Sequence, residues 1–311
     1  MQAVQLDVAS LNTLRDGFRG RLVLPSDEEY DRARAVWNAI ADRHPAIVAR
    51  CAAVTDVVAA LGFAREHGLP IAVRGGGHSV AGFSTCDAGM LIDLSGMRRL
   101  RVDPKARTAW VEGGALLEQL DQAAQAFGLA CPVGVIGHTG VAGLTLGGGM
   151  ARMQRMHGFT IDNLISIDVV TANGEQVHAS DDEHPDLFWG LRGAGANFGI
   201  ATAFVFRLHP VGPMVTQGSV LFSASRAREV AALYREVART APRRMSVTLN
   251  VLKATSEPPF GPEMAASRSS HWARPTSAVK RKRRPTCAGC ARSSSPSWTR
   301  SGRRTTCRSR R

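Results

Sequence analysis

The order of apolar and polar residues predicts short strands alternating with helices along the first 250 residues. Apolar runs, or apolar residues at every second position, predict strands where turn residues bound them. Strands are expected over residues 47–50, 69–73, 90–94, 108–112, 165–171, 176–179, 200–208, 215–222 and 245–252. Helical spacing of apolar residues, with capping residues, predicts helices over residues 26–42, 55–68, 115–127, 150–157, 186–191 and 226–239. This mixture predicts an α+β fold.

A glycine loop, Val-Arg-Gly-Gly-Gly-His-Ser-Val-Ala-Gly at residues 73–82, interrupts the pattern. Glycine takes positive φ easily and lets a ligand approach the backbone. Successive N–H groups in such a turn suit an anion such as a pyrophosphate. Arg74 adds a charge and His78 an imidazole. A nicotinamide-type Rossmann loop is not favoured, because a second strand rather than a helix follows the glycines.

Two further glycine loops lie at residues 132–149 and 192–199. The first of these contains seven glycines among 18 residues, interleaved with Val, Ile and Leu. Flexible linkers are rich in Gly and Ser and are polar. An apolar glycine loop therefore favours packing against a flat ligand over a linker, and no ordinary core helix or strand is expected in it.

The net charge of +13 comes from the end of the chain. Residues 265–311 hold 14 of the 39 Lys and Arg and no acidic residue, which leaves 25 basic against 26 acidic residues in the first 264. The net charge therefore gives no information about the ligands of residues 1–264. The Arg/Ser-rich composition after residue 265 cannot bury a core, so a disordered tail is expected.

The six cysteines are scattered, and they predict neither a disulfide framework nor a metal site. Cys287 and Cys290 form a single CxxC pair, which lacks the second pair of a zinc site. No apolar run is long enough to span a membrane. The polar N-terminal residues argue against a signal peptide, so a cytoplasmic protein is expected.

Taken together, the three loops resemble those of the berberine-bridge-enzyme-like FAD-linked oxidoreductases, within the vanillyl-alcohol-oxidase fold with its PCMH-type FAD-binding domain. The matching segments are Arg-Gly-Gly-Gly-His-Ser at 74–79, His-Thr-Gly-Val-Ala-Gly-Leu-Thr-Leu-Gly-Gly-Gly at 138–149, and Asp-Leu-Phe-Trp-Gly-Leu-Arg-Gly at 186–193 with Asn-Phe-Gly-Ile at 197–200. Order and separation both fit over roughly residues 25–255. The resemblance implies two α+β subdomains that bind FAD.

The resemblance also implies roles for individual residues. His78 would bond to the 8α-methyl of the flavin, and the loop around it would wrap the pyrophosphate. The residues implied to bind the cofactor are Arg74, Gly75, Gly76, Gly77, His78, Ser79 and Gly82; His138, Thr139, Gly140, Gly143, Leu144, Thr145, Gly147 and Gly148; and Asn197, Gly199 and Ile200.

Two residues of the middle loop leave alternatives open. His138 is either a proton handler beside the flavin or a structural loop histidine. Some family members carry a second flavin link from a cysteine in this loop. Alignment on the triple glycine at 147–149 puts that cysteine near Ile136 rather than Cys131. We therefore expect a single link, with Cys131 a small buried residue.

The resemblance divides the chain into an N-terminal segment (1–42), the FAD-binding domain (43–213), a partial substrate domain (214–264) and the tail (265–311). The family's substrate domain supplies the catalytic base, which is expected in a part that this chain lacks. The loss of acidic residues and of periodicity suggests a frameshifted or truncated reading frame.

The expected function is oxidation of a small alcohol, sugar or amine-type substrate by hydride transfer to FAD, with oxygen or another electron acceptor. A flavin-binding fragment with little turnover is a variant of this interpretation. The alternative is a nucleic-acid-binding protein that uses the basic tail, for which non-specific phosphate contacts would be the only basis.

Overall fold

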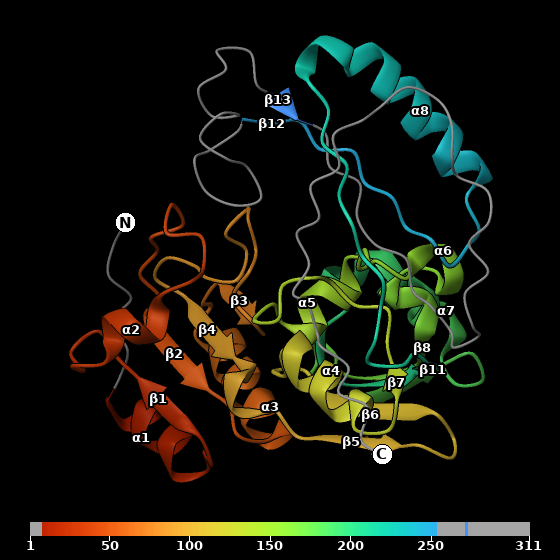
Figure 1. Cartoon of the computed structure of the whole chain (residues 1–311). Coiled ribbons are helices and arrows are strands. Elements are labelled where there is room, and N and C mark those ends of the chain that lie inside the picture. The colour runs from red at the N-terminus through yellow and green to blue at the C-terminus, as the bar shows by residue number, and fades with distance from the viewer. Residues whose placement is uncertain (1–7, 254–270, 273–311) are drawn as a thin grey trace, which may run out of the picture. The chain divides into compact units, whose positions relative to one another are not determined.

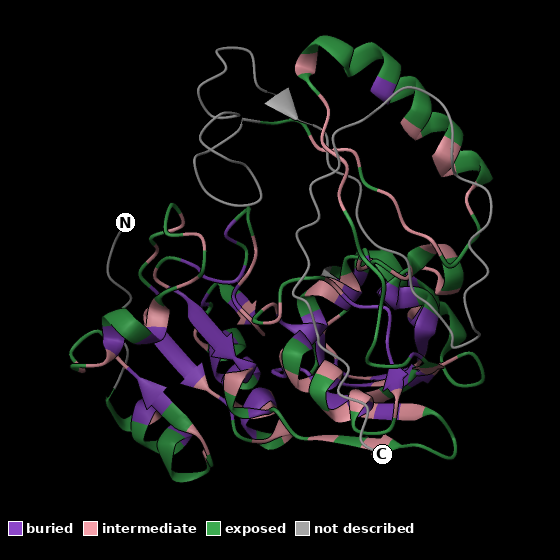
Figure 2. Ribbon diagram, viewed as in Figure 1, coloured by how far each residue is buried: buried purple, intermediate pink, exposed green. Residues whose placement is uncertain are grey.

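The computed structural model describes residues 8–253 and 271–272 (Figure 1). The chain divides into two compact units, residues 1–211 and residues 212–311. The first unit contains two large sheets, each with its own buried core (Figure 2), and a short two-stranded sheet. The α+β fold class predicted from the sequence is confirmed.

The first sheet has four strands in the order β1-β2-β4-β3. Strands β2 (Ile47–Arg50), β4 (Met90–Asp93) and β3 (Ile71–Arg74) are parallel, and β1 (Arg21–Val23) adds to β2 antiparallel. Helix α3 (Val54–Glu66) connects β2 to β3, since parallel strands need a crossover. Residues before position 43 thus contribute β1 to this sheet.

The second sheet has five antiparallel strands in the order β5-β6-β10-β8-β9. They are β5 (Leu100–Asp103), β6 (Thr108–Glu112), β10 (Ile200–Arg207), β8 (Leu164–Val170) and β9 (Gln176–Ser180). Apolar residues of α4 (Leu117–Gln125), α5 (Val141–Leu146) and α7 (Pro185–Ala194) share a core with this sheet. A turn at Asn173-Gly174 joins β8 to β9, with Gly174 at φ +85°.

The remaining elements are short. They are α1 (Val8–Asp16), α2 (Tyr30–Arg34), α6 (Gln154–His157), the pair β7 (Leu129–Ala130) and β11 (His209–Pro210), and 3₁₀ turns at Leu94–Gly96, Thr160–Asn163 and Gly195–Asn197. In the second unit the structure has a 3₁₀ turn at Ala224–Arg226, α8 (Ala227–Thr240), β12 (Leu252–Lys253) and β13 (His271–Trp272).

The prediction of a helix over residues 26–42 is wrong, because α2 covers only Tyr30–Arg34. The carbonyls of Ala33 and Ala35 accept hydrogen bonds from Arg74, and the N–H of Trp37 donates to Gly77 O. Residues 35–38 therefore lie along the first glycine loop. A long-range contact of this kind has no signal in local periodicity.

Two predictions for other segments also fail. The middle glycine loop contains helix α5, whose Val141, Ala142 and Thr145 are buried. Within the described residues 212–253, no strand forms over 215–222, and of 245–252 only Leu252 lies in a strand. The expected disordered tail falls outside the described residues, apart from His271–Trp272.

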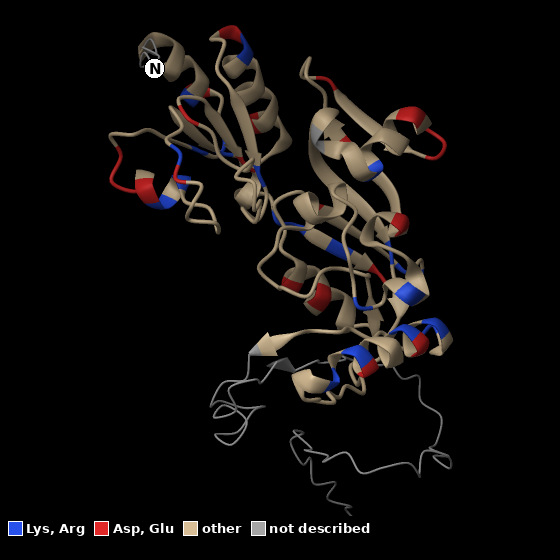
Figure 3. Cartoon of the chain, turned by 90° about the horizontal axis from the view of Figure 1, so that it is seen from above, with Lys and Arg blue, Asp and Glu red and all other residues tan. Residues whose placement is uncertain are grey.

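Charged residues of both signs are interspersed over the described part of the chain (Figure 3). No described helix is long and apolar enough to cross a membrane.

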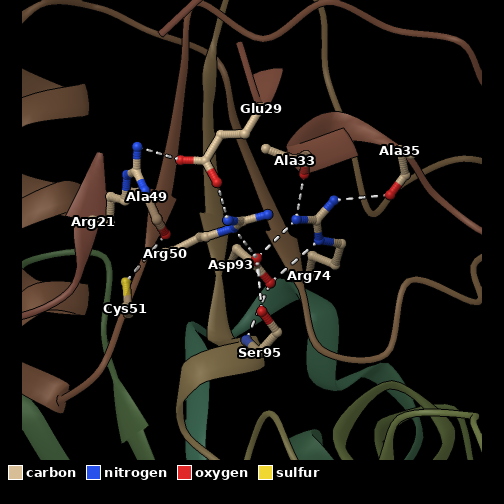
Figure 4. A network of polar contacts seen from close by, with 10 residues as sticks. All are labelled: Arg21, Glu29, Ala33, Ala35, Ala49, Arg50, Cys51, Arg74, Asp93 and Ser95. Carbon is tan, nitrogen blue, oxygen red and sulfur yellow. Dashed lines mark hydrogen bonds and ion pairs between the residues drawn. The ribbon is translucent and has the colours of Figure 1, made fainter. Parts of the chain in front are cut away.

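The three parallel strands of the first sheet end in a charged row. Asp93 at the end of β4 lies in register between Arg50 of β2 and Arg74 of β3 (Figure 4). Arg74 Nη2 lies 2.7 Å from Asp93 Oδ2, and both side chains are more than nine-tenths buried. Ser95 donates to the same carboxylate from its N–H and its hydroxyl. The pair therefore fixes the point where β3 ends and the glycine loop begins.

We expect Asp93→Asn to lower the free energy of unfolding by about 3–5 kcal/mol, because the buried Arg74 guanidinium loses its counter-charge. The control is Asp31→Asn, which breaks an ion pair with Arg34 in which the aspartate is 82% exposed. That change should cost less than about 1 kcal/mol. Urea unfolding of the full chain, followed by circular dichroism, measures both. Equal stability of the two variants would refute a stabilising role for the buried pair.

Two stacked histidines join the C-terminal end of α6 to β11. The rings of His157 and His209 lie 3.7 Å apart between centroids, and His209 Nε2 lies 2.6 Å from Asn163 Oδ1. Burial, with smaller contributions from His157 and Arg207, lowers the pKa of His209 to about 4. The folded unit therefore holds this imidazole neutral.

The stacked histidines predict acid sensitivity. Because the unfolded chain binds a proton at His209 below about pH 6.5 and the folded chain does not, stability is complete above that pH. It should be lost progressively as the pH falls from about 6.5 toward 4. Thermal melting between pH 7.5 and 4.5 should show a smaller fall in Tm for His209→Asn than for the wild type. Parallel pH curves for the two proteins would contradict this coupling.

Candidate functional site

The first glycine loop follows β3 directly. Gly77 has φ +71°, a conformation that favours glycine. The hydroxyl of Ser79 accepts a hydrogen bond from the N–H of Phe83, its carbonyl accepts one from the N–H of Gly82, and Gly82 has φ +77°. Ser79 and Gly82 therefore shape the turn that closes the loop.

The first and middle loops meet backbone to backbone. A Cβ on Gly76 would lie 2.2 Å from Gly140 N, and a Cβ on Gly140 would lie 2.3 Å from Gly76 N. In each case the added Cβ would meet backbone atoms of the facing loop. A change of side-chain rotamer therefore could not relieve the clash. Gly140 is held in turn by a bridge to Leu116. Only glycine at both positions permits this approach.

This approach brings two predicted site histidines together. His78 Nε2 lies 2.6 Å from His138 Nδ1, although the residues are 60 positions apart. The ring of Trp37 stacks on His78 with centroids 5.1 Å apart and an interplanar angle of 18°. Burial, and secondarily the charge of His138, lower the pKa of His78. The shift favours the neutral form of the His78 imidazole.

A cavity of about 340 Å³ lies beside the two loops. Its lining includes the triple glycine, Arg74, His78 and His138, which the sequence predicted as site residues. The sequence did not predict the other lining residues, which are Ala35, Val36, Trp37, Arg50, Asp93, Ser95, Arg98 and Leu116. Arg50 and Asp93 carry a usable signal, since each is a charged residue that ends an apolar strand. Trp37 carries none, because it fell within the wrongly predicted helix.

The charges that line this cavity are three arginines and one aspartate, an excess of positive charge. The guanidinium of Arg74 is bonded to Asp93 and to two carbonyls, so its charge is already balanced. Arg50 is shared between Glu29 at 3.0 Å and Asp93 at 3.8 Å. Arg50 and Arg98 thus supply the excess positive charge of the lining. Arg74 holds the first glycine loop in place.

The other predicted residues of the first two loops have structural contacts. Gly75 approaches the backbone of Gly113. The hydroxyl of Thr145 is buried and donates to Val141 O within α5. Gly147 ends α5, and Gly148 has φ +104°. Thr139, Gly143 and Leu144 lie next to these, with the carbonyl of Thr139 bonded to the N–H of Leu117.

The third loop meets the middle loop but does not line the cavity. The position of a Cβ on Gly195 would lie 2.4 Å from the side chain of Leu146 in α5. Gly199 has φ +129° and packs against Val170 O, and Ile200 is buried in the core of the first sheet. Asn197 is exposed, and its side-chain amide donates to Ala194 O.

The cavity fits the diphosphate part of a dinucleotide. Among the described residues, the structure records no protein acceptor for the backbone N–H groups of Gly76, Gly77 and His78. Free N–H donors, a surface without Cβ atoms and excess positive charge together favour an anion. Cys131, in contrast, is 1% exposed, and burial raises the pKa of its thiol. The expectation of a small buried residue there is confirmed.

Comparison with known proteins agrees with these features. The family model described as "FAD binding domain" matches residues 45–180. The FAD-linked oxidoreductase pgmH of Aspergillus terreus is 37% identical over 83% of this chain and 53% of its own length. The (R)-6-hydroxynicotine oxidase of Paenarthrobacter nicotinovorans is 34% identical over 67% of this chain and 45% of its own.

A solved structure, the BBE-like 1 protein of Physcomitrella patens, superposes with a TM-score of 0.77 at 28% identity. The match covers 87% of this chain and 56% of that one. The chain thus spans about half the length of the relatives that it matches. With its three glycine loops placed as described, the chain belongs to the berberine-bridge-enzyme-like family of FAD-linked oxidoreductases and carries the family's FAD-binding domain.

Proposed function

We propose that this chain holds FAD in the cavity beside the first two loops, in covalent linkage to His78, and that it serves the oxidation of a small alcohol, sugar or amine. The observation that carries the proposal is the position of His78. It directly follows the triple glycine and lines the cavity, and its lowered pKa favours the neutral imidazole. A neutral imidazole has the lone pair that a bond to carbon requires.

Each group around the cavity has a defined task in this proposal. The N–H groups of Gly76 and Gly77 would bind the diphosphate, and Arg50 and Arg98 would offset its charge. The stacked Trp37 limits rotation of the His78 ring. When bound, FAD supplies the hydride acceptor, while the protein binds, orients and tunes it.

The substrate class rests on the relatives. The name of the nicotine oxidase identifies an amine-type substrate for that protein. For this chain we propose a small substrate with oxygen or another acceptor, and a catalytic base outside the described residues. Since the chain spans about half of each relative, FAD uptake and turnover are treated as separable properties. The cytoplasmic location and non-specific nucleic-acid binding by the basic tail remain predictions.

Covalent attachment predicts a fluorescent flavin band that follows the protein through a denaturing gel. His78→Ala should abolish the band while leaving a folded protein, because the only proposed nucleophile is removed. His44→Ala is the matched control, since His44 is an exposed histidine of the same unit and does not line the cavity. Free flavin released from the denatured wild type would disprove the linkage.

The contact between the first two loops predicts that Gly140→Ala weakens FAD binding. The added Cβ pushes Gly76 away, and we expect the Kd for FAD to rise at least about tenfold, or about 1.4 kcal/mol. Gly62→Ala in α3 is the control, because a Cβ there meets nothing within 4 Å. Quenching of flavin fluorescence measures the Kd for both. An unchanged Kd in G140A would show that FAD binding does not depend on the close approach of these loops.

A further inference from the structure

The contact between His78 Nε2 and His138 Nδ1 determines which nitrogen of His78 is free. At 2.6 Å the two nitrogens share one proton, since two bare lone pairs would repel and two N–H groups would clash. Two neutral imidazoles allow only two arrangements. Either His138 donates from Nδ1, or His78 donates from Nε2.

The two arrangements differ in the chemistry that they leave to His78. If His138 donates, the Nε2 lone pair of His78 accepts that bond and its Nδ1 carries the proton, so neither nitrogen can attack carbon. If His78 donates, its Nδ1 keeps a free lone pair. Among the described residues, the structure records no hydrogen-bond partner for that Nδ1. Only the second arrangement yields a nucleophile while the contact persists.

We propose that His138 is a positioning residue for flavin attachment: it accepts the proton of His78 Nε2 and thereby holds His78 in the tautomer whose Nδ1 attacks the flavin. This inference rests on the proposed function, in which His78 is the attachment site. It assigns His138 a role in forming the holoprotein rather than in oxidising substrate.

The surroundings of both rings support this role. The backbone on each side of His138 is fixed, because Gly137 O accepts from the N–H of Glu118 and Thr139 O accepts from the N–H of Leu117. His138 itself is exposed, so its second nitrogen can exchange protons with water. Trp37 holds the plane of the His78 ring on the other side. Burial also lowers the pKa of His78, which favours its neutral form.

The attachment step balances with oxygen as the oxidant. A C–H bond of the 8α-methyl breaks and its proton goes to water, while a bond forms between that carbon and His78 Nδ1. The two electrons released reduce the flavin, and oxygen then takes two electrons and two protons to give hydrogen peroxide. The alkylated His78 is a cation, and His138 Nδ1 can accept the proton from its Nε2.

The test is the rate of covalent incorporation into full-length apoprotein after FAD is added, read as flavin fluorescence on denaturing gels over time. The Kd for non-covalent FAD is measured separately by fluorescence quenching at early times. We expect His138→Ala to slow attachment by about 10- to 100-fold with little change in Kd. His138→Asn should retain a rate within a few-fold of the wild type, since the amide oxygen can accept the same hydrogen bond. His44→Ala is the control.

A second readout is the pH dependence of attachment. In the wild type the rate should fall once the pH is low enough to protonate either imidazole, because the attack needs the lone pair of His78 and the hydrogen bond needs the Nδ1 lone pair of His138. In H138A the rate should depend on the protonation of His78 alone, so its pH profile should differ from that of the wild type. If His138 served only to stabilise the fold, H138A would have the pH profile of the wild type, and H138N and H138A would attach flavin at the same rate.

The outcomes separate this inference from the proposed function. Attachment in H138A at the wild-type rate would overturn the role of His138, and so would an H138N variant as slow as H138A with an unchanged Kd. If the wild type binds FAD but never forms the bond, the covalent linkage and this inference both fail. If the wild type does not bind FAD at all, the proposed function itself fails.

Discussion

The close approach of two glycine backbones, Gly76 and Gly140, is the constraint on which the arrangement of this site depends. With no side chain at either position, segments 64 residues apart in the chain lie in direct contact. The approach sets His78 beside His138 and forms one wall of the cavity. Any Cβ would separate the loops and the two imidazoles with them, so the chemistry of the site depends on two residues that have no side chain.

A second constraint lies where β3 ends and the first glycine loop begins. The buried pair of Arg74 and Asp93 joins the ends of two parallel strands, and the carbonyls of Ala33 and Ala35 accept two further hydrogen bonds from the guanidinium. A buried charge must be paired, so this geometry is specified closely. The guanidinium that the sequence suggests as a phosphate ligand thereby also holds the loop in place, and the arginines at positions 50 and 98 line the same cavity.

The middle loop contacts both the first and the third glycine loop. At Gly140 it contacts the first loop, and through Leu146 of α5 it contacts Gly195 of the third. Its apolar residues explain why it packs rather than behaving as a linker. The third loop is therefore tied to the site through the middle loop, and its Ile200 belongs to the core of the first sheet.

The sequence by itself determined the periodic elements, the position of most strands and the three glycine loops. It also singled out His78 and His138, because local composition and spacing carry those signals. Only the tertiary structure decided that residues 35–38 leave the helix to line the first loop, that Arg74 is an internal counter-ion, and that Trp37 stacks on His78. These features arise from contacts between residues far apart in the chain, where the hydrogen bonds that a buried guanidinium requires and the stacking of two rings outweigh the local helix preference.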